Sequence, residues 1–155
     1  MDTFIRVSAE DFSIADEVDK LTNANVDDGA MVTFTGRVRK RNDGHDVTGL
    51  FLEHYPAMTN KLLADICQQA RAKWQLNRIV VIHRVGQLYL GDNIVFVGVT
   101  SEHRGDAFAA AEFIMDYLKV SAPFWKKETR ANGDSRSDEW VEAKASDQEK
   151  AAHWS

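Results

Sequence analysis

The sequence predicts a fold of the α+β class with two long helices. Two stretches carry apolar residues at helical spacing over many turns, and the candidate strands arrive in neighbouring groups. A doubly wound α/β sheet would instead require strands and helices in regular alternation. The 155 residues match the usual size of one domain and contain no internal repeat, so we expect a single domain over residues 1–155.

The first quarter of the chain predicts a strand, a helix and a second strand. Residues 3–8 alternate as in a short strand, and Ser13 is a suitable N-cap for a helix that follows it. Residues 30–39 alternate between apolar and polar side chains, which is typical of a strand with one buried face. Arg37 and Arg39 fall on the polar face of this strand, so two cations are expected to project from it.

The middle of the chain predicts a turn, three strands and the clearest helix. The string KRNDGH is expected to form a turn or mobile loop, and TGLFLEHY a strand after it. After Pro56, apolar residues follow at helical spacing. They are Met58, Leu62, Ile66, Ala70 and Trp74, with Leu63 and Cys67 widening the stripe. Residues 78–85 and 93–100 are apolar on both faces, which predicts two central strands joined through a turn at 86–92.

The last third predicts a second amphipathic helix from about Gly105 to Val120. Its apolar stripe consists of Ala107, Ala110, Ala111, Ile114, Tyr117 and Leu118. Pro123 prevents the helix from continuing. Beyond it lie the string APFWKKE, a polar loop at 131–138, the short run EWVEA and a tail from about residue 144 that we expect to be loosely ordered.

Charge and composition exclude several classes of function. Nineteen Lys and Arg against 24 Asp and Glu give a net charge of −5, so the whole protein should not attract a nucleic-acid backbone or an anionic membrane surface. A single cysteine cannot form an intramolecular disulfide, and the chain shows neither a signal pattern nor a long apolar run. We expect a cytoplasmic protein whose anion sites are local.

The usual signatures of nucleotide, metal and cysteine chemistry do not occur. No GxxxxGK[ST] or GxGxxG motif follows a strand, and none of the five histidines forms an HExxH pair or a zinc-like spacing with cysteine. We therefore expect no metal site. Cys67 lies on the apolar stripe of the first long helix, where a buried inert thiol is the commoner explanation than a nucleophile.

What remains is a set of cations at the ends of predicted elements. They are Arg37, Arg39, His103, Arg104, Lys119, Lys126 and Lys127. His103 and Arg104 stand between a buried strand and a helix start, where backbone N–H groups favour an anion, which makes them the best local phosphate candidate. The two arginines on the strand could equally solvate its polar face.

The lysines also allow more than one interpretation. Lys119 falls in the last turn of its helix, where the helix dipole stabilises a cation without any functional reason. Met115 lies one turn earlier on the same face, and a lysine beside apolar groups can become a useful base or nucleophile. Lys126 and Lys127 follow two aromatic residues, which suits an interface anchor, a pocket wall or a core edge.

Several strings occur together in a familiar order. They are FTGRVR, LEHYPAMT, HRVGQL, GDNIVFVGVTSEHR, FIMDYLK and APFWKKE, between about Ala30 and Glu128, with EWVEA extending the match. On these strings the chain resembles the catalytic (large) subunit of molybdopterin synthase. The resemblance implies an α/β-hammerhead-type fold with a mixed or antiparallel sheet, and a homodimer of large subunits within a heterotetramer.

The resemblance also implies the reaction. A small ubiquitin-like subunit carries a thiocarboxylate on its C-terminal Gly-Gly tail and donates sulfur to cyclic pyranopterin monophosphate, which forms the dithiolene of molybdopterin. No separate cofactor is then needed, because the partner supplies the sulfur. This sulfurtransferase chemistry would explain why the chain has no nucleophilic cysteine.

By matching position, the resemblance assigns the site residues. Lys119 in FIMDYLK is the catalytic lysine, and Lys126 in PFWKKE is its basic catalytic companion. The substrate-binding positions are Phe34, Arg37, Val38, Arg39, His103, Arg104, Met115, Lys127 and Glu128. Because the family builds its pocket at the dimer interface, His103 and Arg104 are candidates for serving the neighbouring subunit's site.

The chain departs from the family pattern in one segment, and two alternative functions stay open. In ANGDSRSDEW, Glu139 precedes Trp140 where related chains often carry a basic residue, and Arg136 is a candidate replacement within the loop. One alternative is a noncatalytic homologue that binds the partner. The other is an anion-binding hydrolase acting on a cyclic phosphate, which the missing metal motif and nucleophile–base pair disfavour.

Overall fold

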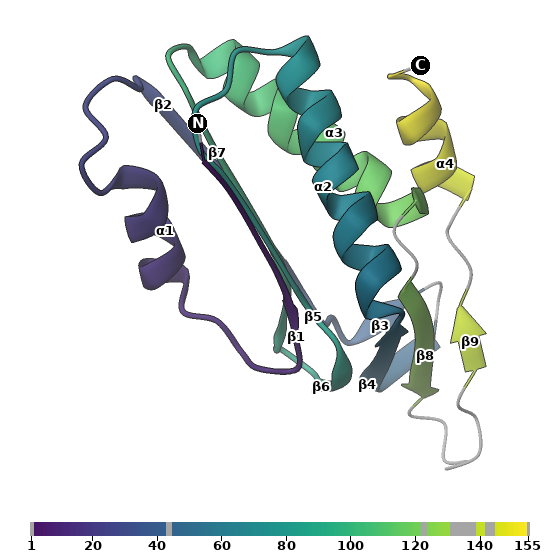
Figure 1. Ribbon diagram of the computed structural model, residues 1–155. Helices are drawn as coiled ribbons and strands as arrows, with labels where there is room; N and C mark the ends of the chain where they lie inside the picture. Colours follow the sequence, from purple (N-terminus) through teal and green to yellow (C-terminus); the bar gives the residue numbers. More distant parts are fainter. Residues whose placement is uncertain (1, 43–44, 122–123, 131–138, 142–144, 155) are drawn as a thin grey trace.

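The computed structural model describes residues 2–42, 45–121, 124–130, 139–141 and 145–154 (Figure 1). Its elements in chain order are β1 (Thr3–Ser8), α1 (Ile14–Thr22), β2 (Ala30–Arg37), β3 (Arg41–Asn42), β4 (His45–His54), α2 (Pro56–Lys73), β5 (Ile79–Arg84), β6 (Gly86–Tyr89), β7 (Asn93–Ser101), α3 (Arg104–Ser121), β8 (Phe124–Arg130), β9 (Glu139–Val141) and α4 (Ala145–Ala152). The predicted α+β class with two long helices, α2 and α3, is confirmed. None of the helices in the described residues is long and apolar enough to cross a membrane.

The first sheet, which we call the larger sheet because its strands contain more residues in total, is mixed and has the strand order β1-β5-β7-β2. β1 pairs with β5 in parallel, and the other two pairings are antiparallel. β5 and β7 are the central strands, as their two apolar faces predict, and nearly every residue in them is buried. A central strand is covered on both faces, which is why its sequence does not alternate.

Helices cover both faces of this sheet (Figure 1). α2 and α3 pack on one face and form the main core with Ile79 and Val81 of β5, whereas α1 packs on the other face over Val80 and Ile82. Side chains of a strand alternate between faces, so His83, two residues after Val81, belongs to the face that α2 and α3 cover.

The second sheet is antiparallel, with the order β3-β4-β8-β9, and β6 pairs with β4. Its register places Leu52 opposite Lys126 and Leu50 opposite Glu128. Both leucines belong to a small separate core that also contains Val38 and Leu88. This sheet lies beside the C-terminal end of α3 and the lower end of the larger sheet in Figure 1.

Local chemistry explains how α1 is fixed on its face of the sheet. Ser13 caps the helix as predicted, since its side chain accepts a hydrogen bond from the Asp16 amide at 3.3 Å. Gly98 of β7 lets the helix approach closely, because a Cβ at that position would overlap Cδ1 of Leu21. The close approach explains why a glycine stands in the middle of a buried strand.

Three sequence-based expectations differ from the structure. Met58 was expected on the buried stripe of α2 but is 55% exposed, because the buried face runs through Thr59, Leu63 and Ile66 instead. The predicted turn at 86–92 also contains a short strand, β6, whose hydrogen bonds to β4 no local pattern reveals. In the KRNDGH segment, Arg41–Asn42 pairs with the start of β4.

The expectation of a loosely ordered tail is wrong for residues 145–154. They form α4, which packs on α3, and Trp154 beyond it donates from Nε1 to Oδ2 of Asp116 at 2.6 Å. The Trp154 ring also meets the rings of Trp74 and Phe113 edge to face. The predicted loop at 131–138, with Arg136, lies outside the described residues.

Candidate active site

Lys119 and Lys126 approach one place from two different elements. Lys119 stands in the last turn of α3, where its side chain is exposed, and Lys126 is a half-buried residue of β8. The two positive charges both lower the pKa of His83, which shows that both act on the same buried ring. The structure therefore brings the two predicted catalytic lysines together.

His83 is the residue of this site that the sequence analysis missed. Its side chain is 6% exposed, and its ring stacks on Phe124 of β8 with 3.8 Å between centroids and 15° between planes. Nδ1 lies 2.8 Å from the carbonyl oxygen of Arg84. Burial, followed by Lys119, Lys126 and His54, lowers the pKa of His83 to about 4, against a partly opposing contribution from the Arg84 carbonyl. The imidazole is therefore neutral at physiological pH.

Phe34 and Met115 lie where they could line a pocket beside Lys119. Phe34 pairs with Val97, which belongs to the core between the sheet and α2 and α3, so its side chain is on the α3 face of β2. It is 43% exposed. Met115 is half-buried and packs against the same core one turn before Lys119. An apolar wall next to the lysine is consistent with the predicted assignment.

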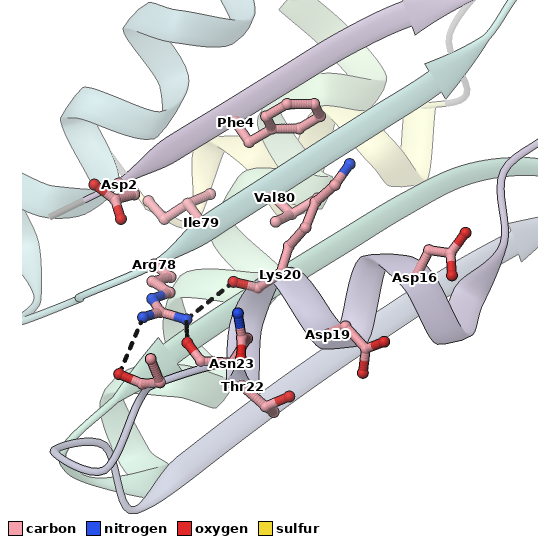
Figure 2. Close-up of a pocket in the computed structure, with 11 residues that line it drawn as sticks. Asp2, Phe4, Asp16, Asp19, Lys20, Thr22, Asn23, Arg78, Ile79 and Val80 are labelled. Carbon is pink, nitrogen blue, oxygen red and sulfur yellow. Dashed lines mark hydrogen bonds between the residues drawn. The ribbon is translucent and has the colours of Figure 1, made fainter.

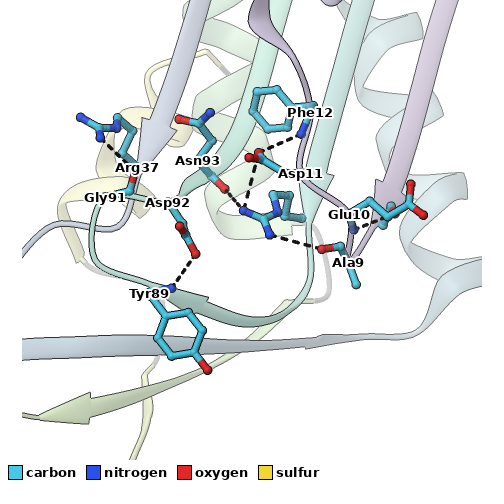
Figure 3. A network of polar contacts seen from close by, with 11 residues as sticks. Ala9, Glu10, Asp11, Phe12, Arg37, Tyr89, Gly91, Asp92 and Asn93 are labelled. Carbon is cyan, nitrogen blue, oxygen red and sulfur yellow. Dashed lines mark hydrogen bonds and ion pairs between the residues drawn. The ribbon is translucent and has the colours of Figure 1, made fainter.

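Arg37 is the last residue of β2, Val38 and Arg39 follow it, and the three side chains have different surroundings. Arg37 donates from Nη2 to the Gly91 carbonyl at 2.9 Å (Figure 3). Val38 exchanges backbone hydrogen bonds with Gly91 and Asp92. Gly91 has a φ of 82°, which favours glycine in this turn. Val38 is buried, and Arg39 is exposed just after it. Arg37 thus holds the turn at Gly91, and both Arg37 and Arg39 are exposed at the surface.

The lysines of β8 point to opposite faces of the strand. Lys126 and Glu128 share the face of Leu50 and Leu52, and Glu128 is 2% exposed. Lys127 pairs with Phe51 and lies on the other face. The register therefore separates Lys127 from Lys126 and Glu128, although the three are neighbours in sequence.

His103 and Arg104 lie at the far end of α3 from Lys119. Both side chains are exposed, and Arg104 is the first residue of the helix. Fifteen residues separate Arg104 from Lys119, which at 1.5 Å per residue is about 22 Å along the helix axis. Within one chain, these two residues do not join the lysine site.

The Arg84 side chain ties the loop after β1 to the strands beside His83. Nη1 donates to the Asn93 carbonyl at 3.2 Å and Nη2 to the Ala9 carbonyl at 3.3 Å, and Asp11 lies 3.7 Å from Nη1. Figure 3 shows Ala9, Asp11 and Asn93 converging there. These contacts hold the end of β5 and with it the carbonyl that meets His83.

A cavity outside this site contains none of the predicted site residues. It has a volume of about 900 Å³ and lies between α1 and the β1–β5 strands (Figure 2). Arg78 lines it but is engaged with backbone carbonyls, among them those of Lys20 and Asn23 at 3.1 and 2.6 Å. This cavity brings no nucleophile or base to the lysine site.

The prediction about Cys67 can be compared with the structure. Cys67 is buried as predicted, and burial raises the pKa of its thiol to about 12, which keeps it protonated and unreactive. Within the described part of the chain, no group of three His, Cys, Asp or Glu side chains could hold a metal ion.

Comparisons with known proteins agree with this fold. The profile of the MoaE protein family matches residues 7–121. The molybdopterin synthase catalytic subunit of Yersinia pestis is 56% identical over 152 residues, which span 98% of this chain and 97% of that protein. The solved structure of the MoaE protein from Burkholderia ambifaria MC40-6 matches this one with a TM-score of 0.82 at 43% sequence identity. The match covers 98% of this chain and 97% of that chain.

The chain belongs to the MoaE family, the catalytic subunits of molybdopterin synthase, which are sulfurtransferases of molybdenum cofactor biosynthesis. A more distant chain shares the fold. It comes from the complex of subunits 1 and 2 of the molybdopterin-converting factor from Helicobacter pylori 26695, with a TM-score of 0.67, 20% identity and coverage of 92% of this chain and 90% of that one.

Proposed function

We propose that the chain transfers sulfur from the C-terminal thiocarboxylate of a small ubiquitin-like subunit to cyclic pyranopterin monophosphate, which becomes the dithiolene of molybdopterin. The observation that carries this proposal is that Lys119, in the last turn of α3, and Lys126, on β8, both lower the pKa of the buried ring of His83. Two cations held at one place can bind an anionic substrate and stabilise charge that develops during transfer.

The residues around the lysines divide the work. Arg39 and Lys126 supply positive charge for the substrate phosphate and for the carboxylate that remains on the partner's tail. Lys119 transfers a proton during the reaction or accepts the acyl group of that tail. Phe34 and Met115 offer an apolar wall for the pterin ring, and Lys127 and Glu128 support the strand that presents Lys126.

Each transfer exchanges one sulfur for one oxygen. A carbon–sulfur bond forms on the substrate as a carbon–oxygen bond there breaks, which joins substrate and tail as a thioester. Water then cleaves the thioester, so the sulfur stays on the substrate and the tail is left as a carboxylate. The exchange needs no oxidant or reductant, so the account requires no metal and no separate cofactor. Two exchanges give the dithiolene, so the spent partner must leave between them. A reducing cytoplasm suits a reaction that handles free sulfur nucleophiles.

The second group of cations supports a dimer with shared sites. His103 and Arg104 are about 22 Å along α3 from Lys119, too far to contact the same small substrate in one chain. In a two-fold dimer they would complete the lysine site of the neighbouring subunit. We propose such a homodimer, with one small subunit on each copy. The Helicobacter pylori neighbour was solved as a complex of two different subunits.

The test compares Lys119→Ala with a matched control, Lys73→Ala. Lys73 is an exposed lysine in the last turn of α2, so both variants remove a lysine from the same kind of helix position. Each is mixed with thiocarboxylated partner and cyclic pyranopterin monophosphate, and product is measured by mass spectrometry while partner binding is measured by size exclusion. We expect Lys119→Ala to bind the partner and form little product, and the control to turn over normally. Wild-type turnover by Lys119→Ala would refute the role of Lys119.

A further inference from the structure

His83 occupies the place where three parts of the fold meet. It belongs to β5 of the larger sheet, its ring lies flat on Phe124 of the second sheet, and its face of β5 is the one that α3 covers. Phe124 is two residues before Lys126, and across the sheet it pairs with His54. The side chain that touches both sheets therefore lies beside the face of β8 that carries Lys126.

The hydrogen bond of His83 fixes which ring nitrogen carries the proton. The Arg84 carbonyl at 2.8 Å can only accept, so Nδ1 is the donor. In the neutral ring, Nε2 then has a free lone pair and acts as an acceptor. The stacking on Phe124 fixes the plane of the ring, and the hydrogen bond to the Arg84 carbonyl fixes which nitrogen faces that carbonyl. The result is an acceptor of fixed position near Lys119 and Lys126.

We propose that His83 is a positioning residue for the catalytic lysines, whose Nε2 accepts a hydrogen bond from an ammonium group at this site, Lys119 first. Lys119 is the expected donor because it stands in the last turn of α3, the helix that covers the face of β5 to which His83 belongs. Such a contact would hold a long, flexible side chain in one direction. This inference rests on the proposed function, since it assigns His83 to the same reaction.

The burial of His83 also explains why it can stay neutral among cations. A protonated imidazole would add a third positive charge beside Lys119 and Lys126, and it would lose the acceptor at Nε2. With Arg84 fastened to Asn93 and Ala9, the carbonyl that orients the ring is itself held in place. The arrangement is the usual one in which a second group fixes the tautomer of a functional histidine.

Two substitutions separate the acceptor from the packing. His83→Phe keeps a ring to stack on Phe124 but has no acceptor, whereas His83→Gln loses the ring and places an amide near Nε2. His153→Phe is the matched control, because His153 is exposed next to the C-terminal end of α4. All three are assayed for kcat and KM in the reconstituted reaction, after circular dichroism and partner binding show that they fold.

We expect His83→Phe to lower kcat at least about tenfold with little change in KM, because a hydrogen bond to a charged group is lost. His83→Gln should retain most of kcat, and His153→Phe all of it. Wild-type kcat in His83→Phe, or an equal loss in His83→Phe and His83→Gln, would overturn the proposal.

A measurement on the wild-type protein decides the tautomer without any activity. Long-range proton–nitrogen NMR of histidine labelled with nitrogen-15 should show His83 neutral at pH 7, protonated at Nδ1 and bare at Nε2. A proton on Nε2 would overturn the proposal. If the wild-type protein formed no product, the proposed function would fail, and this spectrum would still judge the assignment of the acceptor.

Discussion

Sites shared between two subunits can be detected by mixing two inactive variants. Arg104→Ala removes the cation at the start of α3, and Lys119→Ala removes the cation in its last turn. The helix places these residues about 22 Å apart along its axis, which is further than the two side chains span when extended toward each other. If each site takes Lys119 from one copy and Arg104 from the other, the two variants damage different halves of the same site.

The expected activity follows from the two-fold symmetry. Random exchange gives half of the dimers as hybrids, and each hybrid contains one site with both residues intact and one with neither. About a quarter of the wild-type activity should therefore return in an equal mixture of two inactive proteins. A site built within one chain would give no recovery, because every chain in the mixture carries one defect.

The assay dissociates and reassembles the mixed variants, adds thiocarboxylated partner and substrate, and measures molybdopterin formed per subunit. Each variant treated alone is the control for recovery caused by the treatment itself. Activity that stays at the level of the separate variants, although mass spectrometry shows hybrid dimers, would refute the shared site.

Three further predictions concern stability. Burial depresses the pKa of His83 from 6.5 to about 4, so on acidification the unfolded chain binds this proton before the folded chain does. The neutral His83 therefore contributes about 3 kcal/mol to the free energy of unfolding. This contribution is complete above pH 6.5 and is lost as the pH falls toward 4. Urea unfolding measured against pH should show this loss of stability in the wild type. The same loss in His83→Phe would contradict the attribution of the pH dependence to His83. Trp154→Phe should lower the free energy of unfolding by about 1.5 to 3 kcal/mol, because the buried Asp116 carboxylate loses its donor; an unchanged urea midpoint would argue against that bond. Gly98→Ala should cost about 1 to 3 kcal/mol by forcing Leu21 away from the sheet, and wild-type thermal stability would show that α1 adapts without cost.

Regular elements were predictable because their signal is local. The continuous apolar character of β5 and β7 predicted central strands, and the spacing of apolar residues predicted α2 and α3. β6 and α4 were missed for a common reason. β6 is held by hydrogen bonds to β4, and α4 by the contact of Trp154 with α3, which are pairings between distant parts of the chain.

The site residues also differ in whether sequence motifs or contacts between distant parts of the chain reveal them. Lys119 and Lys126 could be named because they match the motifs of a family, and the structure brings them together. His83 appeared only as a polar residue near the end of an apolar strand, which was a usable signal. What makes it important is its stacking on Phe124, 41 positions later in the chain, and no sequence period encodes that contact.

The central claim is that this chain moves sulfur from a protein thiocarboxylate to a pterin. The most direct test mixes the purified protein with the thiocarboxylated small subunit and cyclic pyranopterin monophosphate and follows both substrate and partner by mass spectrometry. The account predicts a pterin that has gained two sulfur atoms as a dithiolene, and a partner whose tail has become a carboxylate. A partner that binds while the pterin remains free of sulfur, under conditions in which a related synthase forms product, would contradict it.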